Sequence, residues 1–349
     1  AMDKAFKNVD NINYNKYKTA PNPALATPVA IERYTKALDD STSTHAGSKD
    51  ITVTLASDVT FASDSADLAS GAEAQLQTVA AQLKQHPDGG TLTIVGHTDD
   101  VQDDAYNQTL SEKRANAVKT RLEQLTSLDK WQTSVSGKGE SEPKINDTTD
   151  EARAVNRRVE ITLTPTGGTT TKTTTPPAGT GSLPENKGPV AKGSEGVTVK
   201  HVSGNSQLTI TIDHVTRSGG YLFGQLHTTL SVKKGSAPDR LEDWLNDKEA
   251  PFSNSRSEKG SRDAVAFAAN GLTLLAAGER IYPADYRDAG FKTHLPLTEL
   301  QLTPPIKAGT TTICVIWPDP GSDTVTLDHA ATRKEVADLA YRLTDIPVK

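Results

Sequence analysis

Two opposite charges, Asp99 and Arg114, stand where a predicted strand gives way to a predicted helix. Asp99 follows the apolar run at 92–95, and Arg114 is four residues from both Leu110 and Val118, on the helix face that should be buried. A desolvated guanidinium needs a carboxylate partner, and Asp99 is the nearest candidate by topology. The pair is either an ion pair that only ties the helix to the strand or part of a binding site.

The elements that must position these charges alternate in type along the chain. Apolar periodicity predicts strands at 51–55, 92–95, 132–136 and 158–163 and helices at 70–85 and 107–125. The second helix is expected to begin with Asn107 as its cap, or with a capping box formed by Thr109 and Glu112. Two strand–helix alternations followed by a last edge strand predict helices packed on one mixed sheet.

Several motifs follow one another within residues 50–164, among them Thr98-Asp99, Leu110-Ser111 and Arg114-Ala115. In this order they resemble the peptidoglycan-binding domain shared by OmpA, the peptidoglycan-associated lipoprotein and the flagellar stator anchor. The family pattern of Thr-Asp, Leu-Ser and Arg-Ala is matched without a gap, and an Asn also falls where the family has one. The matching residues are Thr98-Asp99, Asn107, Leu110-Ser111 and Arg114-Ala115. The segment 59–65 resembles the opening of the family domain, and 156–161 resembles its close.

This resemblance implies a βαβαββ fold that recognises meso-diaminopimelate in the stem peptide of peptidoglycan. Asp99 would accept hydrogen bonds from the distal ammonium, and Arg114 would hold the distal carboxylate in a bidentate pair. A lysine stem lacks that carboxylate and would leave Arg114 unpaired, which discriminates against it. Thr98, Asn107 and Leu110 are expected at the same site because they belong to the matched motif.

Arg157 and Arg158 belong to the conspicuous Asn-Arg-Arg segment of the family. Arg157 is included among the expected binding residues as a contributor to the ligand's carboxylates. The alternative is that one of the two arginines pairs with surface carboxylates while the other helps to set the last strand.

One position departs from the family pattern. The family has Gly three residues after the key Asp, whereas this chain has Gln102, so the turn must avoid a positive φ or take another shape. The acidic residues Asp100, Asp103 and Asp104 raise a calcium loop as a rival interpretation. They lack the alternating spacing and the glycine of an EF-hand, and a solvated acidic turn is the favoured interpretation.

The rest of the 349-residue chain divides by composition. Residues 1–49 are expected to be a flexible tether with a short helix at 31–38, and the Thr-, Pro- and Gly-rich residues 165–195 a linker. From 196 to 349, short strands of period two predict an immunoglobulin-like antiparallel β-sandwich, with a helical insertion at 239–246. The predicted fold class is therefore α+β.

The segment 196–349 resembles accessory β-sandwich domains of exported actinobacterial proteins, especially around Arg280-Ile-Tyr-Pro. No catalytic set emerges there, and its histidines lack metal-ligand spacing. The single cysteine, Cys314, cannot form an intrachain disulfide, and its apolar neighbours predict a buried, inert thiol.

The sequence predicts a non-enzymatic, exported envelope protein that holds diaminopimelate-type peptidoglycan through 50–164 and presents its sandwich to an unidentified protein partner. A signal peptide or lipid anchor is expected to precede these residues. No cofactor or metal is expected, and a net charge of −6 argues against nucleic acid as a partner. Nothing indicates the oligomeric state.

Two alternatives to this function are open. One is an adhesin or assembly scaffold in which Asp99 and Arg114 pair only with each other. The other is a metal-dependent wall hydrolase that uses His97 with Asp99 and Asp100.

Overall fold

The computed structural model describes residues 31–62, 64–169, 182–236, 244–246, 269–287, 294–298, 308–331 and 339–349. Three expectations therefore lie wholly or mostly outside the described residues. They are the tether at 1–30, the centre of the linker at 170–181 and the helical insertion at 239–243.

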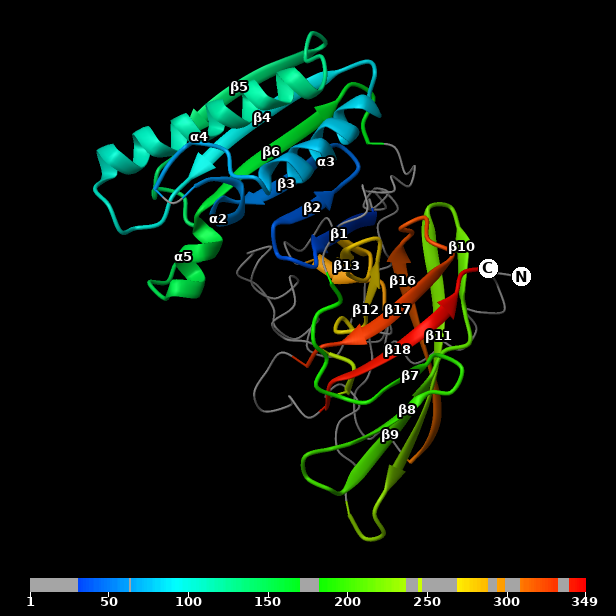
Figure 1. Cartoon of the computed structure of the whole chain (residues 1–349). Coiled ribbons are helices and arrows are strands. Elements are labelled where there is room, and N and C mark those ends of the chain that lie inside the picture. Colours follow the sequence, from blue (N-terminus) through cyan, green and yellow to red (C-terminus); the bar gives the residue numbers. More distant parts are fainter. Residues whose placement is uncertain are drawn as a thin grey trace, which may run out of the picture.

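The first half of the described chain is an α/β domain in which helices cover one face of a sheet (Figure 1). The strands lie in the order β5-β4-β6-β3, with β4 and β5 parallel and the other neighbours antiparallel. The elements are β3 (Ile51–Ala56), α2 (Ser57–Thr60), α3 (Ala72–Lys84), β4 (Gly90–His97), α4 (Asp104–Leu125), β5 (Trp131–Gly137), α5 (Asp150–Asn156) and β6 (Arg158–Pro165). The predicted mixed sheet with helices on one face is confirmed.

The expected place of the last strand was wrong. β6 lies between β4 and β3 rather than at the edge, and β5 is the edge strand. Val159, Ile161 and Leu163 on β6 have no solvent exposure, because helices cover their face and a strand flanks β6 on each side. The order of strands depends on this tertiary packing, and local periodicity does not report it.

The expected start of α4 was also wrong. Asp103 caps the helix, and its carboxylate accepts a hydrogen bond of 2.9 Å from the Tyr106 backbone N–H. Asp is among the best N-cap residues, so the helix begins one turn before Asn107 and the Thr109 capping box is not used. The extra turn places Asn107 inside the helix, where its side chain is free to hold the preceding loop.

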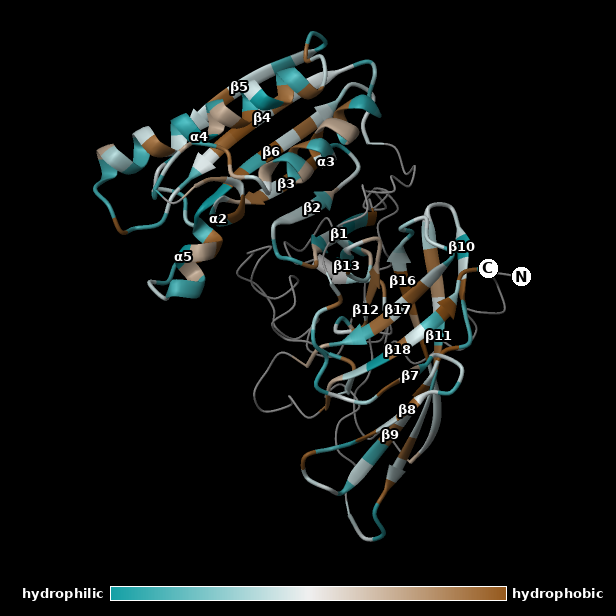
Figure 2. Ribbon diagram, viewed as in Figure 1, coloured by the Kyte–Doolittle hydropathy of each residue, from teal (hydrophilic) through white to brown (hydrophobic). Residues whose placement is uncertain are grey.

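The core of this domain lies between the helices and the sheet. Leu76, Leu92, Ile94, Val118 and Leu122 are fully buried there, and each contributes roughly 1.5–3 kcal/mol relative to an exposed side chain. Figure 2 shows the corresponding hydrophobic residues along the strands and on the inner sides of the helices.

The second half of the chain is an antiparallel β-rich region built from two sheets that enclose one hydrophobic cluster. Trp244, Trp317 and Tyr341 are fully buried in it, and the Trp317 indole donates to the Leu272 carbonyl at 2.8 Å. Its strands are β7 (Val190–Lys192), β8 (Val197–Lys200), β9 (Ser206–Thr211), β10 (Val215–Ser218), β11 (Tyr221–Val232), β12 (Thr273–Ala276), β13 (Glu279–Ile281), β14 (Asp285–Arg287), β15 (His294–Pro296), β16 (Gly309–Pro318), β17 (Thr324–His329) and β18 (Tyr341–Pro347).

Two expectations about this half differ from the structure. Cys314 is exposed, because β16 turns Ile313, Val315 and Trp317 to the core and therefore turns Cys314 to the other face of the sheet. The end of the expected linker is also folded, since β7 pairs with β18 in parallel and Asn186 donates to the Asp328 carboxylate at 2.8 Å.

A hairpin of β1 (Ile31–Ala37) and β2 (Thr42–Ala46) joins the two halves (Figure 1). β2 pairs with β3, and β1 pairs with β13, so one sheet of 13 described strands runs through both halves. The expected tether through residue 49 and the expected helix at 31–38 are both replaced by this hairpin. In residues 31–46, pairing with strands that are distant in the sequence determines the structure and overrides the local helical pattern.

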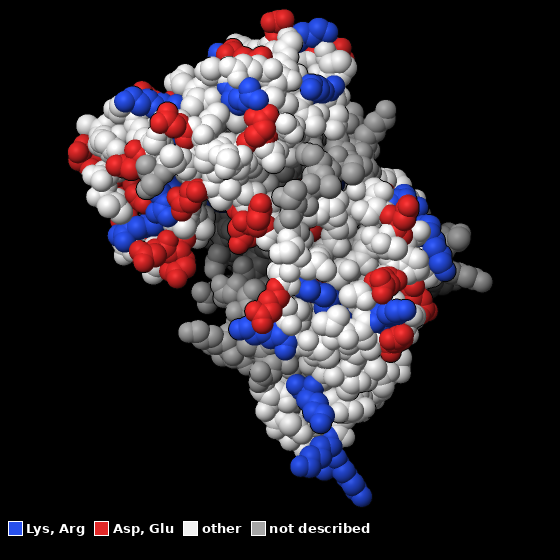
Figure 3. Space-filling view, viewed as in Figure 1, with Lys and Arg blue, Asp and Glu red and all other residues white. Residues whose placement is uncertain are grey.

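Figure 3 shows acidic and basic side chains interspersed over the face that it presents. Within the described ranges, the helices are all too short or too polar to cross a membrane.

Replacing Thr44 by Pro should uncouple the two halves. Thr44 lies on β2 opposite Thr35 of β1 and Val53 of β3, and proline in an interior strand removes a ladder hydrogen bond. We expect a larger radius of gyration by small-angle X-ray scattering while α/β circular dichroism is retained. Thr44→Ala is the matched control, and an unchanged radius for Thr44→Pro would contradict the joining role of the hairpin.

His97, at the end of β4, predicts a specific pH dependence of stability. Its side chain is buried, and neither ring nitrogen has a hydrogen-bond partner in the described part of the chain. Burial together with nearby Arg158 lowers its pKa from 6.5 to about 4. The unfolded chain therefore binds this proton at a higher pH than the folded chain does. The folded state should lose roughly 2–3 kcal/mol from this residue as the pH falls from about 6.5 to about 4.

The His97→Leu variant tests this prediction, because it fills the site without a titrating group. Denaturant unfolding of the variant should show a flatter pH dependence than the wild type over that window. Parallel curves for the two proteins would mean that His97 does not contribute.

Candidate ligand-binding site

A pocket of about 440 Å³ opens in the α/β domain where the β4–α4 turn approaches the segment after β3. All six residues expected from the sequence line it. They are Thr98, Asp99, Asn107, Leu110, Arg114 and Arg157, which come from the turn, from α4 and from the residue between α5 and β6. The strand–turn–helix connection and the order of strands in the sheet bring them together.

Asp99 is paired with Arg157, not with Arg114. Arg157 Nη1 donates to Asp99 Oδ2 at 2.6 Å, while its Nε and Nη2 hold both carboxylate oxygens of Asp58 at 2.7 Å each. The hydrogen bonds that Arg157 donates to Asp58 and Asp99 raise its pKa above the usual value. Asp99 Oδ1 accepts one long hydrogen bond of 3.4 Å, from the Val101 N–H, among the described residues. This oxygen can therefore accept a further hydrogen bond.

Arg114 is buried without a carboxylate partner. Its Nε donates to the Ser65 carbonyl at 2.9 Å, and its guanidinium lies 5.2 Å from the centre of the Phe61 ring. Among the residues that the structure describes, none forms an ion pair with it, and burial lowers its pKa. The expectation that Asp99 would neutralise Arg114 is therefore wrong. Arg157 takes that carboxylate instead.

Asn107 fixes the shape of the turn. Its Nδ2 donates to the carbonyls of Asp99 and Gln102, at 3.2 and 3.0 Å, and to Glu140 Oε2 at 2.6 Å. Gln102 has no positive φ, so the turn keeps a conformation that any L residue can adopt. The departure from the family glycine does not close the pocket, because Gln102 itself lines it.

The acidic turn is more structured than the solvated loop that we expected. Asp103 caps α4, and Asp100 Oδ1 accepts a hydrogen bond of 2.7 Å from Arg153, which lowers the pKa of Asp100. Within the described parts of the chain, no group of three or more His, Cys, Asp or Glu side chains is arranged to hold a metal ion. His97 does not line the pocket.

Several residues of the pocket wall were not expected from the sequence, among them Ser57, Asp58, Phe61 and Asp64. Asp64 accepts a hydrogen bond of 2.8 Å from the Tyr106 hydroxyl. Phe61 and Asp64 fall within the 59–65 segment that resembles the family opening, which was a usable signal. Ser57 and Asp58 precede it and carry no local signal.

Two buried hydroxyls in this pocket have no hydrogen-bond partner among the residues that the structure describes. They are Ser57 Oγ and Thr98 Oγ1, in residues that are 1% and 3% exposed. Buried polar groups are rarely left unsatisfied. Together with Arg114, they give the pocket a polar, positively charged wall.

Comparison with known proteins identifies a family that matches part of this chain. Residues 60–157 match the model of the OmpA family. Outer membrane porin F of Pseudomonas aeruginosa is 43% identical over 103 residues, which cover 30% of this chain and 29% of the porin. The probable lipoprotein YiaD of Escherichia coli is 35% identical over 116 residues, or 33% of this chain and 52% of the lipoprotein. The chain thus spans about a third to a half of the length of these relatives.

Solved structures with similar regions include the cell wall anchor of the T6SS from Pseudomonas aeruginosa, at 29% identity and a TM-score of 0.30, covering 34% of this chain and 83% of that one. The peptidoglycan-associated lipoprotein from Burkholderia pseudomallei has 30% identity and a TM-score of 0.27, covering 32% of this chain and 87% of the other. The matched family segment contains five of the six expected site residues and ends at the sixth, Arg157. Residues 60–157 of this chain form an OmpA-family domain.

Proposed function

We propose that the OmpA-family domain binds diaminopimelate-type peptidoglycan and anchors an envelope protein to the cell wall. The observation that carries the proposal is that one pocket contains two separate charges. Arg114 is buried and has no ion-pair partner among the described residues, and Asp99 is held by Arg157 through only one of its two oxygens. Similar proteins named as a cell wall anchor and as a peptidoglycan-associated lipoprotein support the same class of ligand.

The charges of the pocket suit a zwitterion. The distal end of diaminopimelate carries an ammonium and a carboxylate on one carbon. Arg114 offers Nη1 and Nη2 to the carboxylate, because only its Nε is used by Ser65. Asp99 offers Oδ1 to the ammonium, while Arg157 fixes the orientation of Asp99 through Oδ2. Each ligand charge thus meets an opposite charge that the fold has already desolvated.

The same arrangement accounts for selectivity against lysine. A lysine side chain brings the ammonium without the carboxylate, so Arg114 would become more deeply buried on binding and remain unpaired. Affinity for one stem peptide should be modest, since the recognised group is small. Repeated stems in the wall would raise the effective affinity of a tethered protein.

Several features beyond the pocket complete the proposal. We place the protein in the cell envelope as an exported, non-enzymatic component, in keeping with relatives named as an outer membrane porin and a lipoprotein. We also interpret residues 50–164 as the wall-binding unit and 196–349 as an accessory β-sandwich with an unidentified protein partner. The shared hydrophobic cluster between its two sheets supports that interpretation.

Calorimetric titration of the full chain with a stem peptide ending in diaminopimelate tests the proposal. The wild type should bind this peptide and bind its lysine counterpart at least about tenfold more weakly. Asp99→Ala and Arg114→Ala should each weaken binding by about 30-fold or more, since each removes one partner of a desolvated charge pair, typically worth about 2–5 kcal/mol.

Arg121→Ala is the matched control on the same helix. Arg121 lies two turns after Arg114 and pairs with Glu73 at 2.8 Å, and it does not line the pocket. Its replacement should leave affinity unchanged. If the folded wild type bound neither peptide, the wall-binding proposal would fail.

A further inference from the structure

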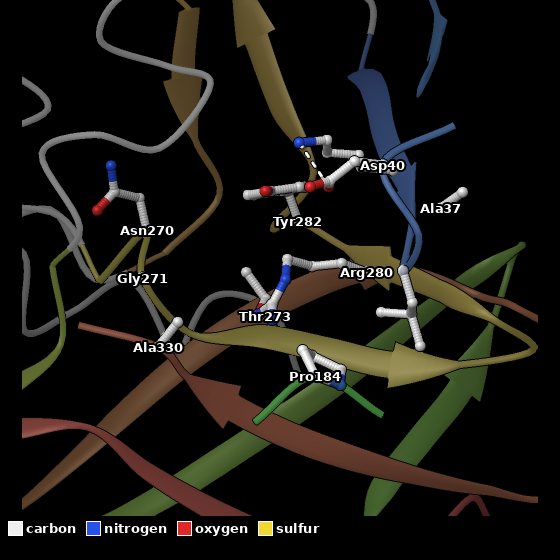
Figure 4. A pocket seen from close by; sticks show the side chains of 11 residues that line it. Ala37, Asp40, Pro184, Asn270, Gly271, Thr273, Arg280, Tyr282 and Ala330 are labelled. Carbon is white, nitrogen blue, oxygen red and sulfur yellow. Dashed lines mark hydrogen bonds and ion pairs between the residues drawn. The ribbon is translucent and has the colours of Figure 1, made fainter. Parts of the chain in front are cut away.

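A second pocket, of about 270 Å³, lies where the β1–β2 hairpin meets the β-rich region (Figure 4). The hairpin supplies one wall through Lys36 and Asp40, and β12 and the residues around β13 supply the other through Thr273 and Arg280. Pro184 closes the base. No residue of this pocket belongs to the pocket around Arg114.

The charges behind this pocket do not balance. Asp328 is 1% exposed, and both of its carboxylate oxygens are paired, Oδ2 with Arg280 Nη1 and Oδ1 with Arg342 Nε, each at 2.8 Å. Among the described residues, neither arginine pairs with another carboxylate. Two guanidinium groups therefore share one negative charge, which leaves one positive charge in a largely desolvated place.

The two arginines differ in how completely their donors are used. Arg342 gives Nε to Asp328 and Nη2 to the Pro184 carbonyl at 2.8 Å. Arg280 uses only Nη1, which reaches both Asp328 and the Thr273 hydroxyl, the latter at 2.6 Å. Its Nε and Nη2 have no partner among the residues that the structure describes. These two nitrogens form the edge of a guanidinium that binds a carboxylate bidentately.

The remaining surface of the pocket limits the size and character of a ligand. In Figure 4 the Arg280 side chain points toward Thr273, while an ion pair of 2.7 Å between Lys36 and Asp40 lies on the other side. The other lining residues are uncharged. They are Ala37, Leu38, Pro184, Asn270, Gly271, Tyr282 and Ala330. The space and its lining suit a carboxylate attached to a small, mostly uncharged body.

We propose that this pocket binds the carboxylate of a small ligand through Nε and Nη2 of Arg280. The free carboxylate at the end of a peptide and that of a sugar acid share this chemistry. Because Lys36, Ala37, Leu38 and Asp40 form one wall, the site is complete only when the hairpin is docked on the β-rich region. Ligand binding therefore stabilises the junction between the two halves of the chain.

Titration of the full chain by ligand-observed NMR tests the proposal, with N-acetylalanine, N-acetylalanine amide and glucuronate as probes. The measurement is repeated in the Arg114→Ala variant, so that the first pocket does not contribute. At least one carboxylate probe should bind with a dissociation constant on the order of 1 mM, and the amide at least about tenfold more weakly. Preference for N-acetylalanine would assign the site to peptide ends, and preference for glucuronate to sugar acids.

Two variants locate the binding. Arg280→Lys keeps the charge beside Asp328 but removes the bidentate edge, and should weaken carboxylate binding at least about tenfold. Arg217→Lys is the matched control, because Arg217 pairs with Asp319 at 2.7 Å outside the pocket. Asp40→Asn should strengthen binding about twofold or more by removing a negative charge from the rim.

The Asp40→Asn change should leave the fold intact, because the Asp40 side chain is 76% exposed and Asn tolerates a φ of 60°. Equal binding of the amide and the acid would overturn the proposal. So would unchanged carboxylate affinity in Arg280→Lys, or no binding of either carboxylate at tens of millimolar, roughly the weakest useful affinity for so small a probe.

Discussion

The structure of the α/β domain depends on a guanidinium that the fold buries and does not neutralise. Arg114 lies on the core-facing side of α4 with a carbonyl and an aromatic ring as its neighbours, and the carboxylate nearest in topology, Asp99, is held by Arg157. A buried charge without a counterion lowers stability. Under the proposed function, a ligand carboxylate would supply the missing charge, so the group that weakens the free domain would also contribute to its affinity.

Arg157 makes this arrangement possible because it occupies two carboxylates at once. It holds Asp58 with two nitrogens and Asp99 with the third, and thereby prevents either from turning toward Arg114. Asn107 holds the backbone of the turn in place, because its side chain on α4 donates hydrogen bonds to the carbonyls of Asp99 and Gln102. Under the proposed function, Asp99 would therefore be oriented before the ligand arrives, which would reduce the entropy lost on binding.

The sequence predicted the parts of this site that local geometry controls. Asp99 ends one element and Arg114 lies on the next, so the strand–turn–helix pattern was enough to bring them to one place. The pairing of Asp99 with Arg157 depends on β6 lying between β4 and β3, which no local pattern reports. The helix start was missed because Asp103 and Thr109 both fit a capping pattern, and only the packed turn selects between them. The β1–β2 hairpin was missed because β13, its partner, lies more than 200 residues away.

The most direct test of this account is a crystal structure of the full chain with a stem tripeptide that ends in diaminopimelate. The account predicts the distal carboxylate within about 3 Å of Arg114 Nη1 and Nη2, and the distal ammonium at a similar distance from Asp99 Oδ1, with the Arg157 pair retained. A peptide bound elsewhere on the chain, or bound in this pocket with Arg114 still unpaired, would contradict it.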